Sequence, residues 1–159
     1  MDFQEKIVEV TREIFETMVM VDVTPGEPLA EHVSRFTCSL TAMVGFAGFK
    51  QGNLAIHTPD AVARGLTGDF LGMEVDEINE DVQDAMGELA NMLAGSLKPF
   101  IADNGEKVEL SLPSVVYGEE YTLTVINKAD WMIVPFSVSH GDFLVCLELK
   151  KGTILKATA

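Results

Sequence analysis

The spacing of hydrophobic residues changes along this chain, and the changes limit the folds that it can adopt. Over residues 2–20, apolar side chains recur every three or four positions, which predicts an amphipathic helix. Residues 33–57 are instead rich in β-branched and aromatic residues, with the turn sequence GFKQGN between two apolar stretches. That pattern predicts a β-hairpin. The intervening VDVTPGEP, with two prolines and a glycine, predicts a loop.

Two further helices are predicted in the middle of the chain. Thr58 followed by Pro59 is typical of a helix start, with Thr58 as the N-cap and Pro59 as the first helical residue. This helix is expected to reach about Leu71. A longer helix is expected over residues 79–98, and Pro99 should end or kink it because proline cannot donate to the helical hydrogen-bond ladder.

The remainder of the chain predicts strands joined by turns. Asn104-Gly105 and the sequence Ser139-His140-Gly141-Asp142 are the predicted turns. The predicted strands cover about 107–112, 120–126, 131–138 and 142–149. Hairpins pair their strands antiparallel, so the sequence predicts an α+β fold with helices packed on a mainly antiparallel sheet. A chain of 159 residues fits one domain, residues 1–159.

Charge and composition exclude several classes of function. Asp and Glu total 25 and Lys and Arg total 11, which gives a net charge of −14. A chain this acidic repels phosphate backbones and anionic lipids, so we expect no nucleic-acid and no membrane partner. The N-terminus lacks the apolar segment of a signal peptide, and two distant cysteines make no disulfide framework. We therefore expect a soluble, cytoplasmic protein.

The helix predicted over residues 79–98 has two distinct faces. One face forms the predicted core stripe of Val82, Ala85, Met86, Leu89, Leu93, Ser96 and Leu97. Roughly opposite lies a polar ridge with spacings of three and four residues, formed by Asp81, Asp84, Glu88, Asn91, Gly95 and Lys98. The ridge is predicted to face solvent.

Two residues of the ridge are poor helix formers. Gly95 costs about 1 kcal/mol relative to Ala in a helix interior, and the Asn91 amide competes for backbone hydrogen bonds. Glu88 and Asn91 are three residues apart and hence neighbours on the helix surface. Such a pair is most often only a solvated surface. Its functional interpretation is positioning and electrostatics: the amide can orient a water molecule and the carboxylate can pair with a cation.

No other catalytic or metal-binding pattern stands out. His32, His57 and His140 are scattered, without the close pairing that metal sites on one element show. The chain contains neither a phosphate-binding Gly-x4-Gly-Lys-Ser/Thr loop nor a Gly-x-Ser-x-Gly elbow. Cys38 and Cys146 are expected to be buried small hydrophobic residues. The sequence therefore predicts no metal site.

The segment DAMGELANMLAGSLK, residues 84–98, follows the pattern Asp-x3-Glu-x2-Asn-x3-Gly. It resembles the signature helix of the CheC/CheX/FliY family of response-regulator phosphatases, and its CheX-like members most closely. The segments LTAMVGFAGFKQGNLAI, TPDAVARGLTGDFLG and SLPSVVYG resemble the hairpin, the preceding helix and the following strand and loop of that family. The resemblance covers residues 33–150 and implies a CheC-like fold.

The resemblance also implies an activity, namely dephosphorylation of a CheY-type response regulator in chemotaxis. Asn91 would orient the attacking water inside the regulator, and Glu88 would pair with a lysine of the regulator. Asp84 occupies the acidic motif position, with a role at the interface or in supporting the helix, and Gly95 would allow close approach. The regulator would supply Mg²⁺, so the chain needs no cofactor or metal of its own. Family likeness further implies a homodimer built through sheet edges.

Two points define the expected site and its alternative. The helix predicted over residues 2–20 has several Glu residues but no Glu-x2-Asn pair, so one site per chain is expected. The alternative to an enzyme is a non-catalytic module on the same fold that binds a receiver domain. An intact Asn91 favours the enzyme, because a module that only docks has no need of a water-orienting amide.

Overall fold

The computed structural model describes residues 2–102, 105–124 and 129–150. Its helices are α1 (Phe3–Ile14), continued by the π-helical turn η1 (Phe15–Val19), α2 (Asp60–Leu71) and α3 (Glu80–Ile101). Its strands are β1 (Thr24–Pro25), β2 (Arg35–Gly48), β3 (Gly52–Pro59), β4 (Val108–Leu110), β5 (Ser114–Thr122), β6 (Ala129–Val138) and β7 (Gly141–Lys150). The predicted α+β fold is confirmed.

One antiparallel sheet contains all seven of these strands. Its order is β1-β6-β7-β3-β2-β4, and β5 also pairs with β2. The predicted hairpin of residues 33–57 is confirmed as β2 and β3, and the hairpin turn at Ser139 and His140 joins β6 to β7. On one side of β2, β4 and β5 pair with consecutive parts of the same strand, so they form one interrupted edge.

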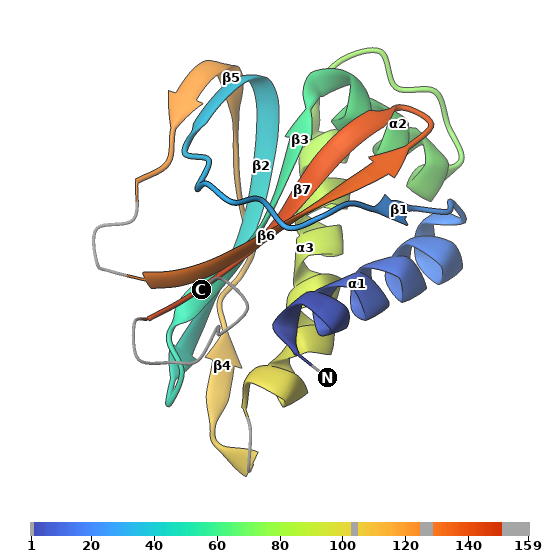
Figure 1. The fold of residues 1–159 in the computed structure, drawn as a ribbon. Helices are drawn as coiled ribbons and strands as arrows, with labels where there is room; N and C mark the ends of the chain where they lie inside the picture. Colours follow the sequence, from blue (N-terminus) through green and yellow to red (C-terminus); the bar gives the residue numbers. More distant parts are fainter. Residues whose placement is uncertain (1, 103–104, 125–128, 151–159) are drawn as a thin grey trace.

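The three α-helices lie on one face of the sheet (Figure 1). Alternate residues of β7 point to this face, and Phe143, Val145 and Leu147 belong to the main core together with residues of α1 and α3. The opposite face of the sheet has a small apolar cluster of its own, formed by Ala55, Ile133 and Cys146. The chain after β1 runs along β6 there, with Leu29 N–H donating to the carbonyl of Ile133 at 2.9 Å.

Local capping explains where α1 begins. The side chain of Asp2 accepts a hydrogen bond from the Glu5 backbone N–H at 2.8 Å, and the Glu5 carboxylate accepts from the Asp2 N–H at 3.1 Å. This reciprocal pair is a capping box. It fixes the start of the helix predicted over residues 2–20.

The prediction for the start of α2 is wrong. Thr58 belongs to β3, where it pairs with Leu40, and its hydroxyl donates to the Leu40 carbonyl at 3.0 Å instead of capping a helix. Pro59 is extended, with φ −60° and ψ 155°, and is itself the N-cap, so the helix begins at Asp60. The expected end near Leu71 is confirmed.

Four other expectations need correction. α3 continues through Pro99 to Ile101, and Ser96 is exposed instead of belonging to the core stripe. The strand expected over 120–126 lies earlier, as β5, because residues 114–122 pair with β2. Cys38 is exposed, whereas Cys146 is buried as expected. Asn104, residues 125–126 and the last nine residues of the predicted domain lie outside the described residues.

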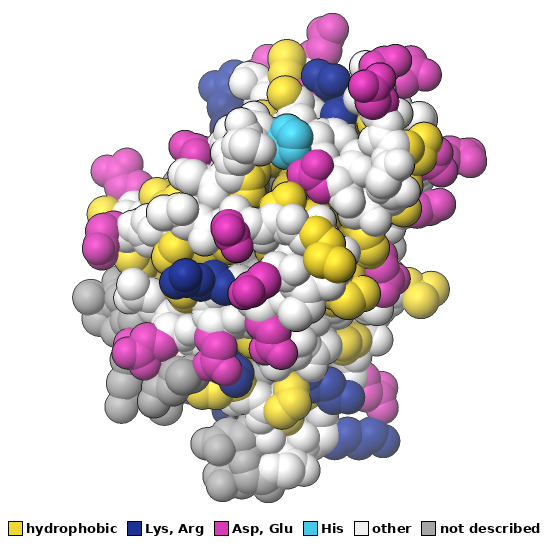
Figure 2. All heavy atoms as spheres, turned by 90° about the vertical axis from the view of Figure 1, so that its right-hand side faces the viewer, with side chains coloured by type: hydrophobic (Ala, Val, Ile, Leu, Met, Phe, Trp, Pro, Cys, Tyr) yellow, Lys and Arg dark blue, Asp and Glu magenta, His cyan; other side chains and the backbone are white. Residues whose placement is uncertain are grey.

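Figure 2 views the molecule from the side on which the helices lie, and acidic side chains are spread over much of this face. Basic side chains occur there in a few separate places. Among the described residues, no helix is long and apolar enough to cross a bilayer.

Candidate functional site

The polar ridge predicted on the long helix lies on the outer side of α3. Asp84, Glu88 and Gly95 are exposed, and Asn91 is half-buried. The residues on the opposite side are buried, as the predicted core stripe requires, with the exception of Ser96. The Asp-x3-Glu-x2-Asn-x3-Gly pattern therefore forms one accessible row along the helix.

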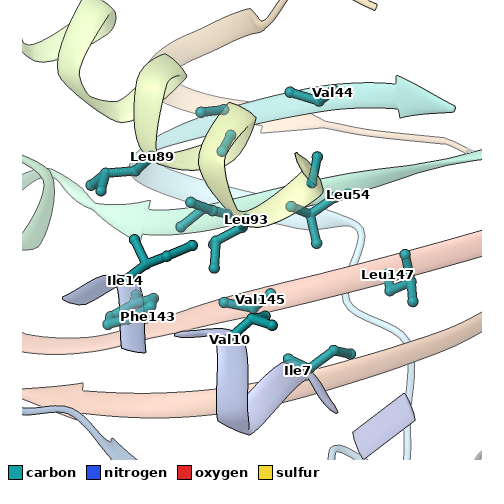
Figure 3. Packing of buried hydrophobic residues seen from close by; sticks show 14 of the residues in the cluster. Ile7, Val10, Ile14, Val44, Leu54, Leu89, Leu93, Phe143, Val145 and Leu147 are labelled. Atoms are coloured by element: carbon teal, nitrogen blue, oxygen red, sulfur yellow. The ribbon is translucent and has the colours of Figure 1, made fainter. Parts of the chain in front are cut away.

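The inner side of α3 holds this row in place. Leu89, Ala90 and Leu93, which flank Glu88 and Asn91 in the sequence, have no exposed surface. Figure 3 shows Leu89 and Leu93 reaching toward core residues of the neighbouring elements. At the N-terminus of the helix, the Asn79 side chain accepts from the Val82 N–H at 3.1 Å. A helix anchored in this way positions its outer side chains better than a loop would.

Neither Glu88 nor Asn91 is engaged by other residues that the structure describes. Within the described residues, the ion pairs of Lys6, Arg35, Arg64 and Lys107 all go to other carboxylates, and no side-chain hydrogen bond reaches Asn91. Both side chains keep their full capacity to bind a partner. That is what a docking or positioning role needs.

The glycines of α3 differ in what surrounds them. A Cβ atom at Gly87 would lie 3.4 Å from Pro113 and 3.8 Å from Val115, so this glycine packs against the chain that follows β4. At Gly95 an added Cβ would meet nothing within 4 Å. The packing of the described residues therefore gives no reason for glycine at position 95, where a side chain would fit freely.

An exposed leucine lies beside this row, and sequence reasoning missed it. Leu112 is 87% exposed and directly precedes Pro113, which lies over α3 at Gly87. The loop is held by Ser111: its backbone N–H donates to the Gly45 carbonyl at 2.9 Å, and its hydroxyl accepts from the Gly45 N–H at 2.8 Å. The available signal in the sequence was an apolar residue between Ser111 and Pro113, in a loop.

We call this region the candidate docking surface. It consists of Asp84, Glu88, Asn91 and Gly95 on α3 together with Leu112. In the described part of the chain, the acidic residues of this surface are not part of any cluster of three close metal-ligating groups. The surface offers an amide, carboxylates and an apolar contact, but no nucleophile.

Known proteins resemble this chain in sequence. A sequence model of the family described as chemotaxis phosphatase CheX matches residues 40–137, more than half of the chain and all of the candidate docking surface. The CheY-P phosphatase CheX of Thermotoga maritima is 28% identical over 134 residues, which are 83% of this chain and 85% of that protein.

Solved structures share the fold. A CheC-like superfamily protein from Shewanella sp. PV-4 has a TM-score of 0.82 and 25% identity, covering 94% of this chain and 97% of that one. A CheX–CheY–BeF3–Mg²⁺ complex from Borrelia burgdorferi has a TM-score of 0.80 and 20% identity, covering 94% of this chain and 99% of that chain. Identity as low as that of the second structure shows the fold alone. The predicted CheC-like fold is confirmed.

Proposed function

The chain belongs to the CheX family of chemotaxis phosphatases, and we propose that it hydrolyses the aspartyl phosphate of a CheY-type response regulator in the cytoplasm. The observation that carries this proposal is the pair of unengaged side chains, Glu88 and Asn91, on the rigid outer side of α3. The name of the Thermotoga maritima relative supports the choice of substrate. The Borrelia burgdorferi complex pairs the same fold with a CheY protein.

Asn91 is the proposed catalytic residue. Its side-chain amide has both a donor and an acceptor, so it can hold a water molecule in line with the phosphorus atom. Attack by that water forms a P–O bond and breaks the bond between phosphorus and the aspartyl oxygen, which leaves as a carboxylate, while the protons of the water stay with the released phosphate. Phosphoryl transfer of this kind requires mainly positioning and charge neutralisation, and an amide suffices for the first.

Charge neutralisation is assigned to the regulator. No metal-ligating cluster occurs at the candidate docking surface within the described residues, so this chain is expected to bring no cofactor to the reaction there. Mg²⁺ held by the regulator would neutralise the phosphoryl oxygens. The role of this chain is to deliver Asn91 and to exclude bulk water around it.

The other residues of the candidate docking surface are proposed to bind the regulator. Glu88 would form an ion pair with a lysine of the regulator, and Asp84, one turn earlier, would extend the acidic contact. Gly95 would let the regulator approach the helix backbone. Leu112 would add an apolar contact beside them, where burial of a leucine contributes about 1.5–3 kcal/mol.

We also propose the homodimer that the family resemblance implies. The edge strand β5 has one side paired with β2, and all of its residues are exposed or only partly buried. An edge of this kind is able to pair with a second copy. The mass of the protein in solution tests this point separately from activity.

The test of the proposed function is phosphate loss from a candidate CheY-type receiver domain. The receiver is phosphorylated with acetyl phosphate in Mg²⁺, and its decay is followed with no addition, with this protein and with the Asn91→Ala variant. The proposal predicts faster decay with the wild-type protein only. Ser96→Ala, an exposed change outside the candidate docking surface, should behave like wild type.

The alternative function is a non-catalytic module that binds a receiver domain. It predicts that the phosphorylated receiver binds the protein but loses phosphate no faster than it does alone. That outcome with every receiver of the same cell would replace the proposed enzyme by the docking module. The unengaged Asn91 amide is the observation that favours the enzyme.

A further inference from the structure

A cavity lies on the face of the sheet that the α-helices leave open. Along β7, Phe143, Val145 and Leu147 point toward the helices, so the alternating Cys146 and Glu148 point the other way. The segment between β1 and β2 runs over this face and brings His32 to them. The cavity has a volume of about 490 Å³, and its lining includes His32, Met43, Asn53, His57, Glu148 and Lys150.

Three side chains of different chemistry meet here. The Nε2 atom of His32 lies 2.8 Å from Oε1 of Glu148, and Sγ of Cys146 lies 3.6 Å from the same oxygen. The three potential ligand atoms all lie within 4.8 Å of one another. Among the described residues this is the one cluster of three or more such groups.

The second oxygen of Glu148 has no partner among the described residues. Glu148 is only 7% exposed, and its Oε2 atom is buried with no hydrogen bond to the part of the chain that the structure describes. A buried carboxylate without full compensation is costly, because its hydration is lost. A cation bound between these three groups, through Oε1, would offset the charge of this buried carboxylate.

We propose that His32, Cys146 and Glu148 bind one Zn²⁺ ion. Imidazole, thiolate and carboxylate are the ligands that zinc uses in proteins, and three of them leave a fourth position for water. Here that position would open into the cavity. This inference concerns the opposite face of the sheet from α3 and does not depend on the proposed phosphatase activity.

Because the three ligand atoms lie within 4.8 Å of one another, zinc coordination requires shifts of about 1 Å at most. Tetrahedral coordination at zinc bond lengths places ligand atoms roughly 3.3–3.8 Å apart. The separation of 3.6 Å between Cys146 and Glu148 already fits this range. The hydrogen bond of 2.8 Å between His32 and Glu148 would have to lengthen by about half an ångström, which the exposed position of His32 allows.

The ion would fasten one part of the chain to another. His32 lies on an irregular segment, whereas Cys146 and Glu148 lie on β7 inside the sheet. Among these three groups, the hydrogen bond between His32 and Glu148 is what connects the segment to β7 in the absence of metal. Coordination would close this segment over the open face of the sheet.

The test is metal binding by the full chain, freed of tags and of metal. Zn²⁺ is titrated against a chromogenic chelator in a large excess of Mg²⁺, which blocks weak binding by exposed acidic groups. Co²⁺ is used in parallel, because a thiolate ligand gives a sulfur-to-cobalt charge-transfer band.

The proposal predicts that each chain binds one Zn²⁺ ion tightly and that the Co²⁺ form shows this band. His32→Ala, Cys146→Ser and Glu148→Gln should each weaken binding at least about tenfold, as loss of even an outer partner of a ligand does.

Two matched variants serve as controls. Cys38→Ser removes the exposed thiol, and His140→Ala removes a histidine that contacts Asp69 in a similar way, at 2.7 Å. Both should bind Zn²⁺ as tightly as wild type. Absence of tight binding overturns the proposal, as does binding that depends on Cys38 or His140. If Cys146→Ser fails to fold, unchanged binding by the exposed variant His32→Ala still overturns it.

Discussion

At the scale of single residues, the site depends on side chains that the fold positions but does not use. Asn91 is a poor helix former inside α3, and its side chain has no hydrogen-bonded partner among the described residues. Gly95 has open space where a side chain could stand. Both residues lower the stability of the helix, and no contact among the described residues compensates for that loss.

Asn91→Ala should therefore separate activity from stability. We expect phosphatase activity to fall by about 100-fold or more, the effect of removing one positioned polar group. The free energy of unfolding should stay equal or rise by about 0.5 kcal/mol, because alanine is the better helix former. Phosphate release and urea unfolding, measured on one preparation, check both. A large loss of stability would show that Asn91 has a structural role instead.

Gly95→Ala should change stability and docking in opposite directions. The free energy of unfolding should rise by about 1 kcal/mol, since alanine replaces glycine in an open helix position. Binding of the regulator should weaken about tenfold, which corresponds to ~1.4 kcal/mol, because the new methyl group separates the two surfaces. Ser96→Ala is the matched control on the same turn. Unchanged binding by Gly95→Ala would contradict close approach at this position.

His57 should make stability depend on pH. Burial, and in second place the nearby His32, lower the pKa of His57 to about 4, and its ring stacks on Phe36 at 4.2 Å. The pKa in the folded state lies below the value of about 6.5 in the unfolded state. The contribution of neutral His57 to the free energy of unfolding is therefore complete above pH ~6.5 and is lost as the pH falls toward 4. The loss amounts to at most about 3 kcal/mol.

The measurement is urea unfolding between pH 7 and pH 4 in the presence of a chelator. His57→Gln cannot take up the proton, so its stability should fall less steeply over this range than that of wild type. The hydroxyl of Thr41, which contacts His57 at 2.8 Å, keeps its second partner Tyr121 in this variant. Equal pH dependence in both proteins would show that His57 titrates normally in the fold.

Which residues could be found from the sequence depends on how far apart their partners lie. Glu88 and Asn91 are three residues apart on one helix, so periodicity alone predicts that they are neighbours on its outer side. Leu112 lies near α3 because the next residue, Pro113, packs on Gly87, and that contact is tertiary. His32 and Glu148 are 116 residues apart, and no local spacing could bring them together.

At the scale of elements, tertiary contacts explain the boundaries that local signals missed. α3 passes Pro99 because its last turn is held from outside: Ile101 is 2% exposed, and the Phe100 ring meets Phe3 edge-on at 4.9 Å. Gly118 and two glutamates weaken the strand signal of β5, but pairing with β2 supplies its hydrogen bonds. The longer and more regular patterns, α1, α3 and the β2–β3 hairpin, were predictable.

Packing of α3 on the sheet should dominate the stability of the fold. Leu93 has no exposed surface and lies between α3 and the core residues of the sheet (Figure 3). Leu93→Ala should lower the free energy of unfolding by about 2–5 kcal/mol, as truncation of a buried leucine does. Urea unfolding followed by Trp131 fluorescence measures this. A loss below about 1 kcal/mol would mean that the helix is not anchored as described.

At the scale of the whole molecule, charge sets how the protein meets its partner. The net charge is −14, and acidic side chains are spread over the helical side (Figure 2). Receiver domains are often acidic too, so long-range repulsion is expected and the contact must be complementary locally, through pairs such as Glu88 with a lysine.

Salt should therefore not weaken docking. Raising ionic strength shortens the screening length, which is about 10 Å at 0.1 M, and thereby reduces the repulsion between two acidic proteins. We expect the affinity for the receiver to stay constant or to rise as NaCl is increased. Titrations at low and high salt measure it. A steep loss of affinity would contradict the expectation and would indicate that opposite charges dominate the interface.

The central claim is that Asn91 acts in the chemical step whereas Glu88 acts in docking. The most direct measurement is kcat and KM for dephosphorylation of a phosphorylated CheY-type receiver by wild type, Asn91→Ala and Glu88→Ala. The account predicts that Asn91→Ala lowers kcat with little change in KM, and that Glu88→Ala mainly raises KM. Unchanged kcat in Asn91→Ala would contradict it.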